Sequence, residues 1–140
     1  MRYVLDCSVA LKWFFQEPLS DRAIVLLARV QEGEAHLVAP DCIVPELGHA
    51  CRKLVLGGKL SVEESCAAID EFTALPILLA PSRLLARQAM QLAVSHMATF
   101  YDALYLALAE RENLKVLTAD DRMANAFASL NRTLRLSSFE

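Results

Sequence analysis

Apolar and polar positions along this chain form short buried runs separated by longer stretches with helical spacing. The apolar runs are only three to four residues long and rich in β-forming side chains. Short, continuously apolar strands are typical of a parallel sheet that is covered on both faces. The predicted strands are residues 3–5, 36–38, 77–79 and 115–118, with a weaker fifth at 133–136.

Between these runs, apolar residues recur at helical spacing, and breaker residues fall where helices should begin and end. Ser61 and Glu64 have the spacing of a capping box, and Gly57 and Gly58 follow the preceding helix. Alternation of strands and helices predicts an α/β fold, a short parallel sheet sandwiched by helices, in one domain over residues 1–140. The predicted helices begin at residue 7 and cover 20–30, 42–56, 61–75, 84–96, 99–113 and 121–130.

One predicted helix is apolar nearly all round. Residues 101–109 read Tyr-Asp-Ala-Leu-Tyr-Leu-Ala-Leu-Ala, so this helix is expected to be central and buried. Asp102 is the single acid in this stretch, which makes it conspicuous.

Composition narrows the class of protein. The chain has 140 residues, 55% hydrophobic residues and a formal net charge of −3, with 14 Lys and Arg against 17 Asp and Glu. These values exclude a disordered chain and disfavour a basic nucleic-acid clamp. No uncharged stretch is long and apolar enough for a membrane span, and Asp6 interrupts what a signal peptide would need to be apolar. We therefore expect a soluble cytoplasmic protein that does not associate with membranes.

The cysteines and histidines do not suggest a zinc site. The four cysteines lack a Cys-x-x-Cys pair, and the three histidines are widely separated along the chain. We expect free buried thiols at Cys7, Cys42, Cys51 and Cys66.

A few carboxylates lie in apolar surroundings, unlike most of the 17 acids. Each also lies at or near a predicted helix start, so capping of a helix is the alternative explanation for any one of them. Two of them, Asp6 and Asp120, closely follow predicted strands, and in a parallel sheet ligands bind at that carboxyl edge. The set is Asp6, Glu46, Asp102, Asp120 and Asp121.

Carboxylates brought together repel one another, and divalent cations that prefer oxygen ligands relieve that repulsion. Mg²⁺ or Mn²⁺ suits such a site, and two ions could clamp both oxygens of an in-line phosphoryl displacement. The hydroxyls of Ser8 and Thr118, each two residues from an acid, are placed to orient the ligands.

Taken in order, these motifs resemble the PIN-domain family, and within it the VapC-type toxins of toxin–antitoxin pairs. The resemblance rests on Val-Leu-Asp6-Cys-Ser8, Pro45-Glu46-Leu, Tyr101-Asp102-Ala-Leu-Tyr105 and Leu117-Thr118-Ala-Asp120-Asp121. Together the motifs extend over residues 3–122.

The resemblance implies a metal-dependent RNA endonuclease that hydrolyses phosphodiester bonds. In this reading Asp6, Asp102 and Asp120 bind Mg²⁺ or Mn²⁺, and Glu46 binds metal or helps to position and deprotonate water. Asp121 either supplements the site or occupies the first turn of a helix. The resemblance also implies an RNA substrate and a cognate antitoxin protein, and the apolar excess suggests a homodimer.

One position departs from the family pattern. Many such toxins carry Asn three residues after the second acid, and this chain has His49 there. Three roles for the imidazole stay open: a hydrogen-bond donor in place of the amide, a contact to a substrate phosphate, or an ordinary surface histidine.

Two other functions are compatible with parts of the pattern. A Mg²⁺-dependent phosphatase of the haloacid dehalogenase type also uses an Asp after the first strand, but it needs a second Asp where this chain has Ser8. A catalytically inactive PIN-like interaction module is the other alternative, although it would have no need for the costly carboxylates.

The sequence contains few residue patterns that are typical of RNA-binding surfaces. The aromatic residues fall mostly at core spacing, except that Trp13, Phe14 and Phe15 are consecutive, which suggests either a partner surface or plain core packing. Scattered basic residues are the candidates for phosphate contact. The alternative explanation is that each lies on a solvent-exposed helix face and binds nothing. These bases are Lys12, Arg52, Lys53 and Arg122.

Overall fold

A five-stranded sheet, parallel throughout, forms the centre of the molecule in a computed structural model that describes all residues 1–140. Its strand order is β3-β2-β1-β4-β5, so β1 lies in the middle. All five predicted strands are present, and the predicted fold class is confirmed. The strands are β1 (Arg2–Leu5), β2 (His36–Pro40), β3 (Leu78–Ala80), β4 (Val116–Thr118) and β5 (Thr133–Arg135).

The strand order creates a switch point beside β1. Val4 pairs with Val38 of β2 on one side and with Val116 of β4 on the other. The chain proceeds from β1 to β2 and β3 in one direction and then returns to add β4 on the opposite side. At such a point the connections leave the sheet toward opposite faces, which opens a crevice at the carboxyl ends of the strands.

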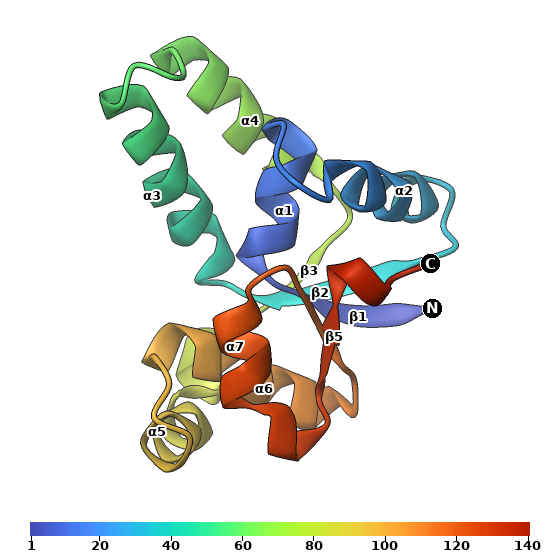
Figure 1. Cartoon of the computed structure of the whole chain (residues 1–140), viewed down its shortest axis with the longest axis vertical. Helices are drawn as coiled ribbons and strands as arrows, with labels where there is room; N and C mark the ends of the chain where they lie inside the picture. The colour runs from blue at the N-terminus through green and yellow to red at the C-terminus, as the bar shows by residue number, and fades with distance from the viewer.

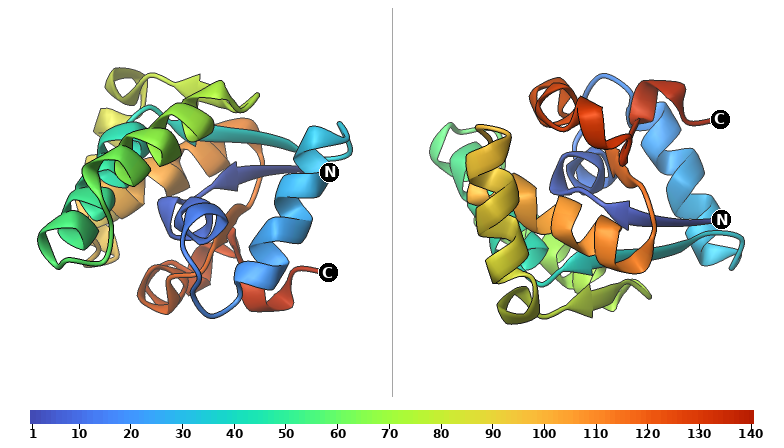
Figure 2. Two further views of the ribbon diagram at one scale, coloured as in Figure 1. Left: turned by 90° about the horizontal axis from the view of Figure 1, so that it is seen from above. Right: turned by 90° about the horizontal axis from the view of Figure 1, so that it is seen from below.

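Two helical layers cover the sheet, as Figures 1 and 2 show. The first four helices lie on one side of the sheet, and the last three lie on the other side, with both chain termini near each other at the sheet's amino edge. The first layer contains α1 (Cys7–Phe14), α2 (Ser20–Gln31), α3 (Ile43–Leu56) and α4 (Val62–Ala74). The second contains α5 (Ala86–Ser95), α6 (Phe100–Glu112) and α7 (Asp121–Ala126).

Two predicted helices are shorter than the sequence suggested. The helix predicted from residue 84 begins only at Ala86, because Ser82–Leu84 forms a separate 3₁₀ turn whose Ser82 is bonded to the side chain of Asp41. The helix predicted to reach residue 130 ends at Ala126 because the fully buried Phe127 leaves helical geometry to pack into the core. A second 3₁₀ turn, Ala128–Leu130, follows it.

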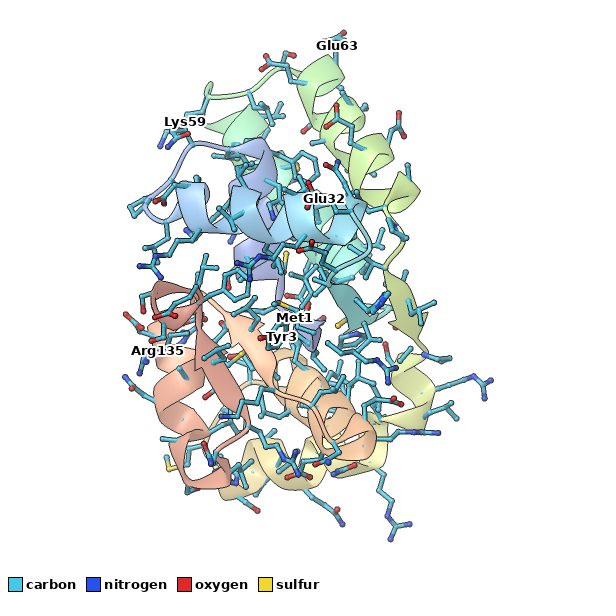
Figure 3. All side chains as sticks on the ribbon, turned by 90° about the vertical axis from the view of Figure 1, so that its right-hand side faces the viewer. Met1, Tyr3, Glu32, Lys59, Glu63 and Arg135 are labelled. Atoms are coloured by element: carbon cyan, nitrogen blue, oxygen red, sulfur yellow. The ribbon has the colours of Figure 1, made fainter.

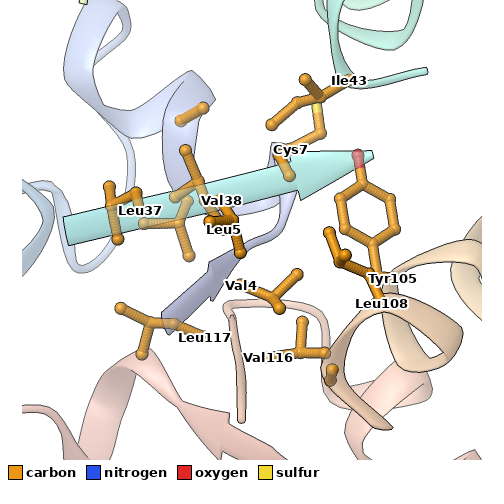
Figure 4. Packing of buried hydrophobic residues seen from close by; sticks show 14 of the residues in the cluster. Val4, Leu5, Cys7, Leu37, Val38, Ile43, Tyr105, Leu108, Val116 and Leu117 are labelled. Carbon is orange, nitrogen blue, oxygen red and sulfur yellow. The ribbon is translucent and has the colours of Figure 1, made fainter. Parts of the chain in front are cut away.

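The apolar helix α6 is the centre of the core. Every residue from Ala103 to Ala109 is buried, as the all-round apolar pattern predicts. Figure 4 shows Tyr105 and Leu108 of this helix packed beside Val4 and Val116 of the sheet. This packing holds the amino end of α6, which carries Asp102, close to the carboxyl edge of the sheet.

Helices α3 and α4 form an arm that extends away from the sheet (Figure 1). Lys59 and Glu63 project outward at its tip, as Figure 3 shows. A capping box formed by Ser61 and Glu64 begins α4, as predicted. The arm carries Glu46 near its base.

The aromatic run on α1 packs against the core. Trp13 is buried, its indole N–H donates to the carbonyl of Ala23 at 2.8 Å, and Phe14 and Phe15 are partly buried against the same core. The structure therefore favours core packing for this run.

The prediction of buried thiols is correct at three positions and wrong at Cys66, which is exposed because it faces solvent on α4. All four cysteines are free.

Membrane-spanning length is not reached by any single helix. Only α5 and α6 taken together, bent by 115° at their junction, have the length and apolarity of a span.

Candidate functional site

A pocket of about 740 Å³ lies at the carboxyl edge of the sheet, beside the switch point. Four carboxylates from four different parts of the chain line it: Asp6 after β1, Glu46 on α3, Asp102 on α6 and Asp120 before α7. Residues more than 100 positions apart are thus gathered where ligands bind in open α/β sheets. Their catalytic and metal-binding roles stay predictions.

Asp6 is the most deeply buried of these acids, with only 4% of its surface exposed. It occupies the N-cap position of α1, but its side chain makes no capping bond. Instead, Oδ2 accepts hydrogen bonds from Ser8 Oγ at 2.5 Å and Thr118 Oγ1 at 2.7 Å. Capping of the helix therefore does not explain this carboxylate.

Burial raises the pKa of Asp6 from its ordinary value of 3.8 to about 6. The hydrogen bonds from Ser8 and Thr118 oppose that rise, whereas the charges of Asp102 and Glu46 add to it. The ionised form of Asp6 is thus costly in the folded protein unless a cation approaches.

The two hydroxyls also join the ends of β1 and β4. Ser8 Oγ accepts the backbone N–H of Ala119 at 2.9 Å, and Thr118 Oγ1 accepts the backbone N–H of Asp120 at 3.0 Å. Each hydroxyl therefore donates to Asp6 while fixing the loop that carries Asp120. These bonds set the position of Asp120 relative to Asp6.

Glu46 is held through one of its two carboxylate oxygens. The hydroxyl of Tyr105 donates to Oε1 at 3.1 Å, and the thiol of Cys42 donates to the same atom at 3.3 Å. Figure 4 shows the Tyr105 hydroxyl at the carboxyl end of β2. Burial raises the pKa of Glu46, those two hydrogen bonds lower it, and the Asp102 charge raises it. Oε2 accepts no hydrogen bond from the protein.

Asp102 stands in the first turn of α6, where its backbone N–H donates to Thr99 Oγ1 at 3.0 Å. The Thr99 backbone N–H makes no reciprocal bond to this carboxylate, so no capping box forms here. Burial raises the pKa of Asp102, and the nearby charge of Asp120 raises it further, while Thr99 and Arg122 act in the opposite direction.

Asp120 does cap its helix. Oδ1 accepts the backbone N–H groups of Arg122 at 2.9 Å and of Met123 at 3.4 Å. Oδ2 lies 3.9 Å from the guanidinium of Arg122, whose side chain is 80% exposed. Oδ1 of Asp120 therefore serves the helix, Oδ2 lies near Arg122, and the residue lines the pocket.

Three other residues named from the sequence have clear positions. Ser8 and the exposed His49 line the pocket, and Thr118 lies buried next to it. Asp121 does not line the pocket and forms an ion pair with Arg135 instead.

Sequence reasoning missed the two residues that hold Glu46. Tyr105 lies three residues after Asp102 and Cys42 four before Glu46, so helical spacing was the available signal. Both were hidden because a tyrosine in an apolar helix and a cysteine beside a strand are ordinary core residues.

Hard divalent cations fit the chemistry of this donor set, which consists of carboxylate oxygens. Asp6, Glu46 and Asp102 form no ion pair with a basic side chain, and Arg122 offsets only part of the charge at Asp102. The side chains are not preassembled around an ion, because no group of three or more His, Cys, Asp or Glu side chains has a metal-binding arrangement.

This chain has a parallel sheet covered by helices on both faces and an acidic pocket at its switch point. These features place it among the open α/β proteins, a class that includes PIN domains. Residues 3–128 match the PIN domain family. The chain therefore belongs to the PIN-domain family, and the phosphatase alternative is wrong.

The chain is similar in sequence to a curated ribonuclease and similar in fold to two solved structures. Ribonuclease VapC1 of Mycobacterium tuberculosis is 41% identical over 108 residues, which cover 74% of this chain and 76% of that protein. The crystal structure of PAE2754 from Pyrobaculum aerophilum superposes with a TM-score of 0.71 at 18% identity, covering 99% of this chain and 94% of the other. The crystal structure of VapBC2 from Rickettsia felis, bound to a DNA fragment from their promoter, gives a TM-score of 0.65 at 13% identity, with 96% and 97% covered.

Proposed function

We propose that this protein is a metal-dependent RNA endonuclease that acts as the toxin of a toxin–antitoxin pair. One observation carries the proposal: four carboxylates from separate elements line one pocket at the switch point of a PIN fold. The ribonuclease name of a relative that is 41% identical supports RNA as the substrate.

The metal ligands in this proposal are Asp6, Asp102, Asp120 and Glu46, which offer oxygen donors to one or two Mg²⁺ or Mn²⁺ ions. When bound, the metal supplies Lewis-acid polarisation of the phosphoryl oxygen and lowers the pKa of a water molecule. Three of these carboxylates, Asp6, Glu46 and Asp102, lack an ion pair with a basic side chain, which supports this assignment.

Glu46 is the residue best placed to manage the attacking water. Tyr105 and Cys42 fix Oε1, and Oε2 is free to accept a hydrogen bond or a proton. Ser8 and Thr118 keep Asp6 oriented through hydrogen bonds to Oδ2. Asp121 has no part in the reaction, since it pairs with Arg135 outside the pocket.

A cognate antitoxin protein is the proposed partner. The VapC-type resemblance implies it, and the similar fold of a protein solved as VapBC2 supports it. We further propose a homodimer in the cytoplasm. Support for a second copy comes from large apolar side chains exposed on and beside α5, namely Met90, Val94 and Met97.

The inactive-module alternative is the second candidate function. It retains the same fold and would bind the same protein partner without cleaving RNA. The buried Asp6 argues against it, because an ionisable group with a pKa near 6 in a pocket is costly to a purely structural domain.

Cleavage of a mixed RNA pool tests the proposal. We expect cleavage with Mg²⁺ or Mn²⁺, none with chelator, and strong loss in Asp6→Asn and in Asp102→Asn. Asp70→Asn, which removes an exposed acid on α4, is the matched control and should cleave normally. Equal cleavage by the wild type and both pocket variants would overturn the mechanism, and a wild type that never cleaves RNA while still binding its antitoxin would favour the inactive module.

A further inference from the structure

The pocket extends beyond its carboxylates along one face of α3. Glu46, His49, Ala50 and Lys53 all line it, and their spacing of three, four and seven residues places them on a single helix face. Seven residues of helix correspond to a length of about 10 Å. The cavity is therefore a groove with an acidic end at Glu46 and a basic end at Lys53.

Lys53 is available to bind an anion in this groove. The four ion pairs of the protein involve other bases, and Lys12 in particular is paired with Glu17 at 3.0 Å. Arg52, its neighbour in sequence, lines a different hollow between α3 and α4. Of the bases on α3, Lys53 alone faces the carboxylate pocket, and the exposed imidazole of His49 lies one turn closer to Glu46.

An exposed aromatic ring lies on the opposite wall. Tyr101 precedes Asp102 on α6, lines the same pocket and is 59% exposed, whereas Tyr105 one turn later is fully buried. An exposed tyrosine at the rim of a nucleic-acid site can stack on a base, because every base presents a π-face.

We propose that Tyr101 and Lys53 contact the substrate in this groove, with Tyr101 stacking on a base beside the cleaved phosphate and Lys53 binding a flanking phosphate. The inference rests on the proposed ribonuclease function and assigns two substrate-contacting residues to that site. A lone phosphate monoester would occupy only the acidic end, whereas a polynucleotide uses the full length of the groove. In a duplex the bases are already stacked on each other, so Tyr101 selects an unpaired base in a loop or an open strand.

Binding of a fluorescent mixed-sequence oligoribonucleotide, measured by anisotropy in Ca²⁺ with the RNA shown to stay intact, tests the stacking contact. Tyr101→Ala should raise Kd by roughly 5- to 150-fold, the range set by one aromatic stack, whereas Tyr101→Phe keeps the ring and should bind nearly as the wild type does. Ile24→Ala, which removes an exposed apolar side chain on α2 outside the pocket, is the matched control. On a fully abasic oligonucleotide of equal length, Tyr101→Ala and the wild type should bind equally.

The salt dependence of Kd tests the phosphate contact. Lys53→Gln should reduce the slope of log K against log salt by about 0.7, the value for one phosphate on a single strand. Arg52→Gln removes the same charge one residue away from the groove, and it should change the slope far less.

The outcomes separate this inference from the proposed function. A wild type that cleaves RNA normally, with Tyr101→Ala losing as much affinity for the abasic chain as for the base-bearing one, overturns the stacking role alone. Equal slopes for Lys53→Gln and Arg52→Gln overturn the phosphate contact. Tighter binding of the wild type to a duplex than to the same single strand also overturns the stacking role, because Tyr101 needs an unpaired base. Failure of the wild type to bind or cleave any RNA overturns the ribonuclease function together with this inference.

Discussion

The phenolic oxygen of Tyr105 lies 3.1 Å from Oε1 of Glu46, so a residue of the buried central helix reaches an acid on the arm across the carboxyl edge of the sheet. Tyr105 is 0% exposed, and its ring is fixed by the core around it. The core of the fold thereby sets the direction in which Glu46 points. Burial and the carboxylates Asp6 and Glu46 also raise the pKa of Tyr105, which keeps its hydroxyl a proton donor.

Removal of this hydroxyl should slow cleavage without weakening RNA binding. Tyr105→Phe leaves the thiol of Cys42 as the single donor to Glu46. Loss of one hydrogen bond to a charged group should lower kcat on the order of tenfold, and KM should stay nearly unchanged. Tyr3→Phe is the matched control, because its ring packs edge-on against Phe139 at 6.1 Å, far from the pocket. An unchanged kcat in Tyr105→Phe would show that Glu46 needs no support from the core.

Stability of the metal-free protein should fall as pH rises. The pKa of Asp6 is about 6 in the folded protein against 3.8 ordinarily, so the folded state binds its proton more tightly than the unfolded state does. The contribution is fully present at acidic pH and is lost as Asp6 ionises between about pH 4 and pH 7, with a magnitude of roughly 3 kcal/mol.

Urea unfolding of the wild type and Asp6→Asn in chelator, followed across that pH range, measures this contribution. The uncharged amide has no proton to lose, so Asp6→Asn should match the wild type in acid and exceed it in stability near neutral pH. Parallel stability curves for the two proteins would contradict the burial of an ionisable Asp6.

Divalent metal should restore the stability that the metal-free protein loses near neutral pH. Mg²⁺ or Mn²⁺ that binds only the folded state adds about 2.7 kcal/mol at a concentration one hundred times its Kd, and should raise the Tm by several degrees. The rise should shrink near pH 5, because protons compete with the metal for Asp6. Differential scanning fluorimetry at both pH values measures it, and an equal rise in Asp6→Asn would place the ion elsewhere.

Thr118 should matter both to Asp6 and to the loop that carries Asp120. Thr118→Val removes the 2.7 Å bond to Asp6 and the partner of the Asp120 N–H, so near neutral pH the free energy of unfolding should drop by about 1.5–3 kcal/mol and cleavage should fall. Thr118→Ser keeps the hydroxyl and should restore most of both. Equal losses in the serine and valine variants would assign Thr118 to packing alone, since it is 1% exposed in the core.

The sequence predicts the sheet and the buried helix α6 well because both depend on local pattern. Short apolar runs, and a helix apolar on all sides, have few stable placements other than a covered parallel sheet and a core. The sequence could not tell that Asp6 makes no capping bond whereas Asp120 does, because an acid before a helix looks the same in both cases. Nor could it place Tyr101 at the pocket and Tyr105 in the core, since that depends on how α6 is rotated against the sheet.

The adjacent acids Asp120 and Asp121 should differ sharply in their effect on activity. Asn caps a helix as well as Asp does, so Asp120→Asn should keep the two bonds to the backbone of α7, and with them the Tm, while losing the charge that faces the pocket. Asp121→Asn breaks only the ion pair with Arg135. The Asp121 side chain is 83% exposed, so this pair contributes at most about 1 kcal/mol. The variant should therefore cleave RNA within about twofold of the wild type. Cleavage rates and melting temperatures of the two variants, measured side by side, separate the roles. Normal cleavage by Asp120→Asn would reduce this residue to a helix cap and leave Asp6, Glu46 and Asp102 as the metal ligands.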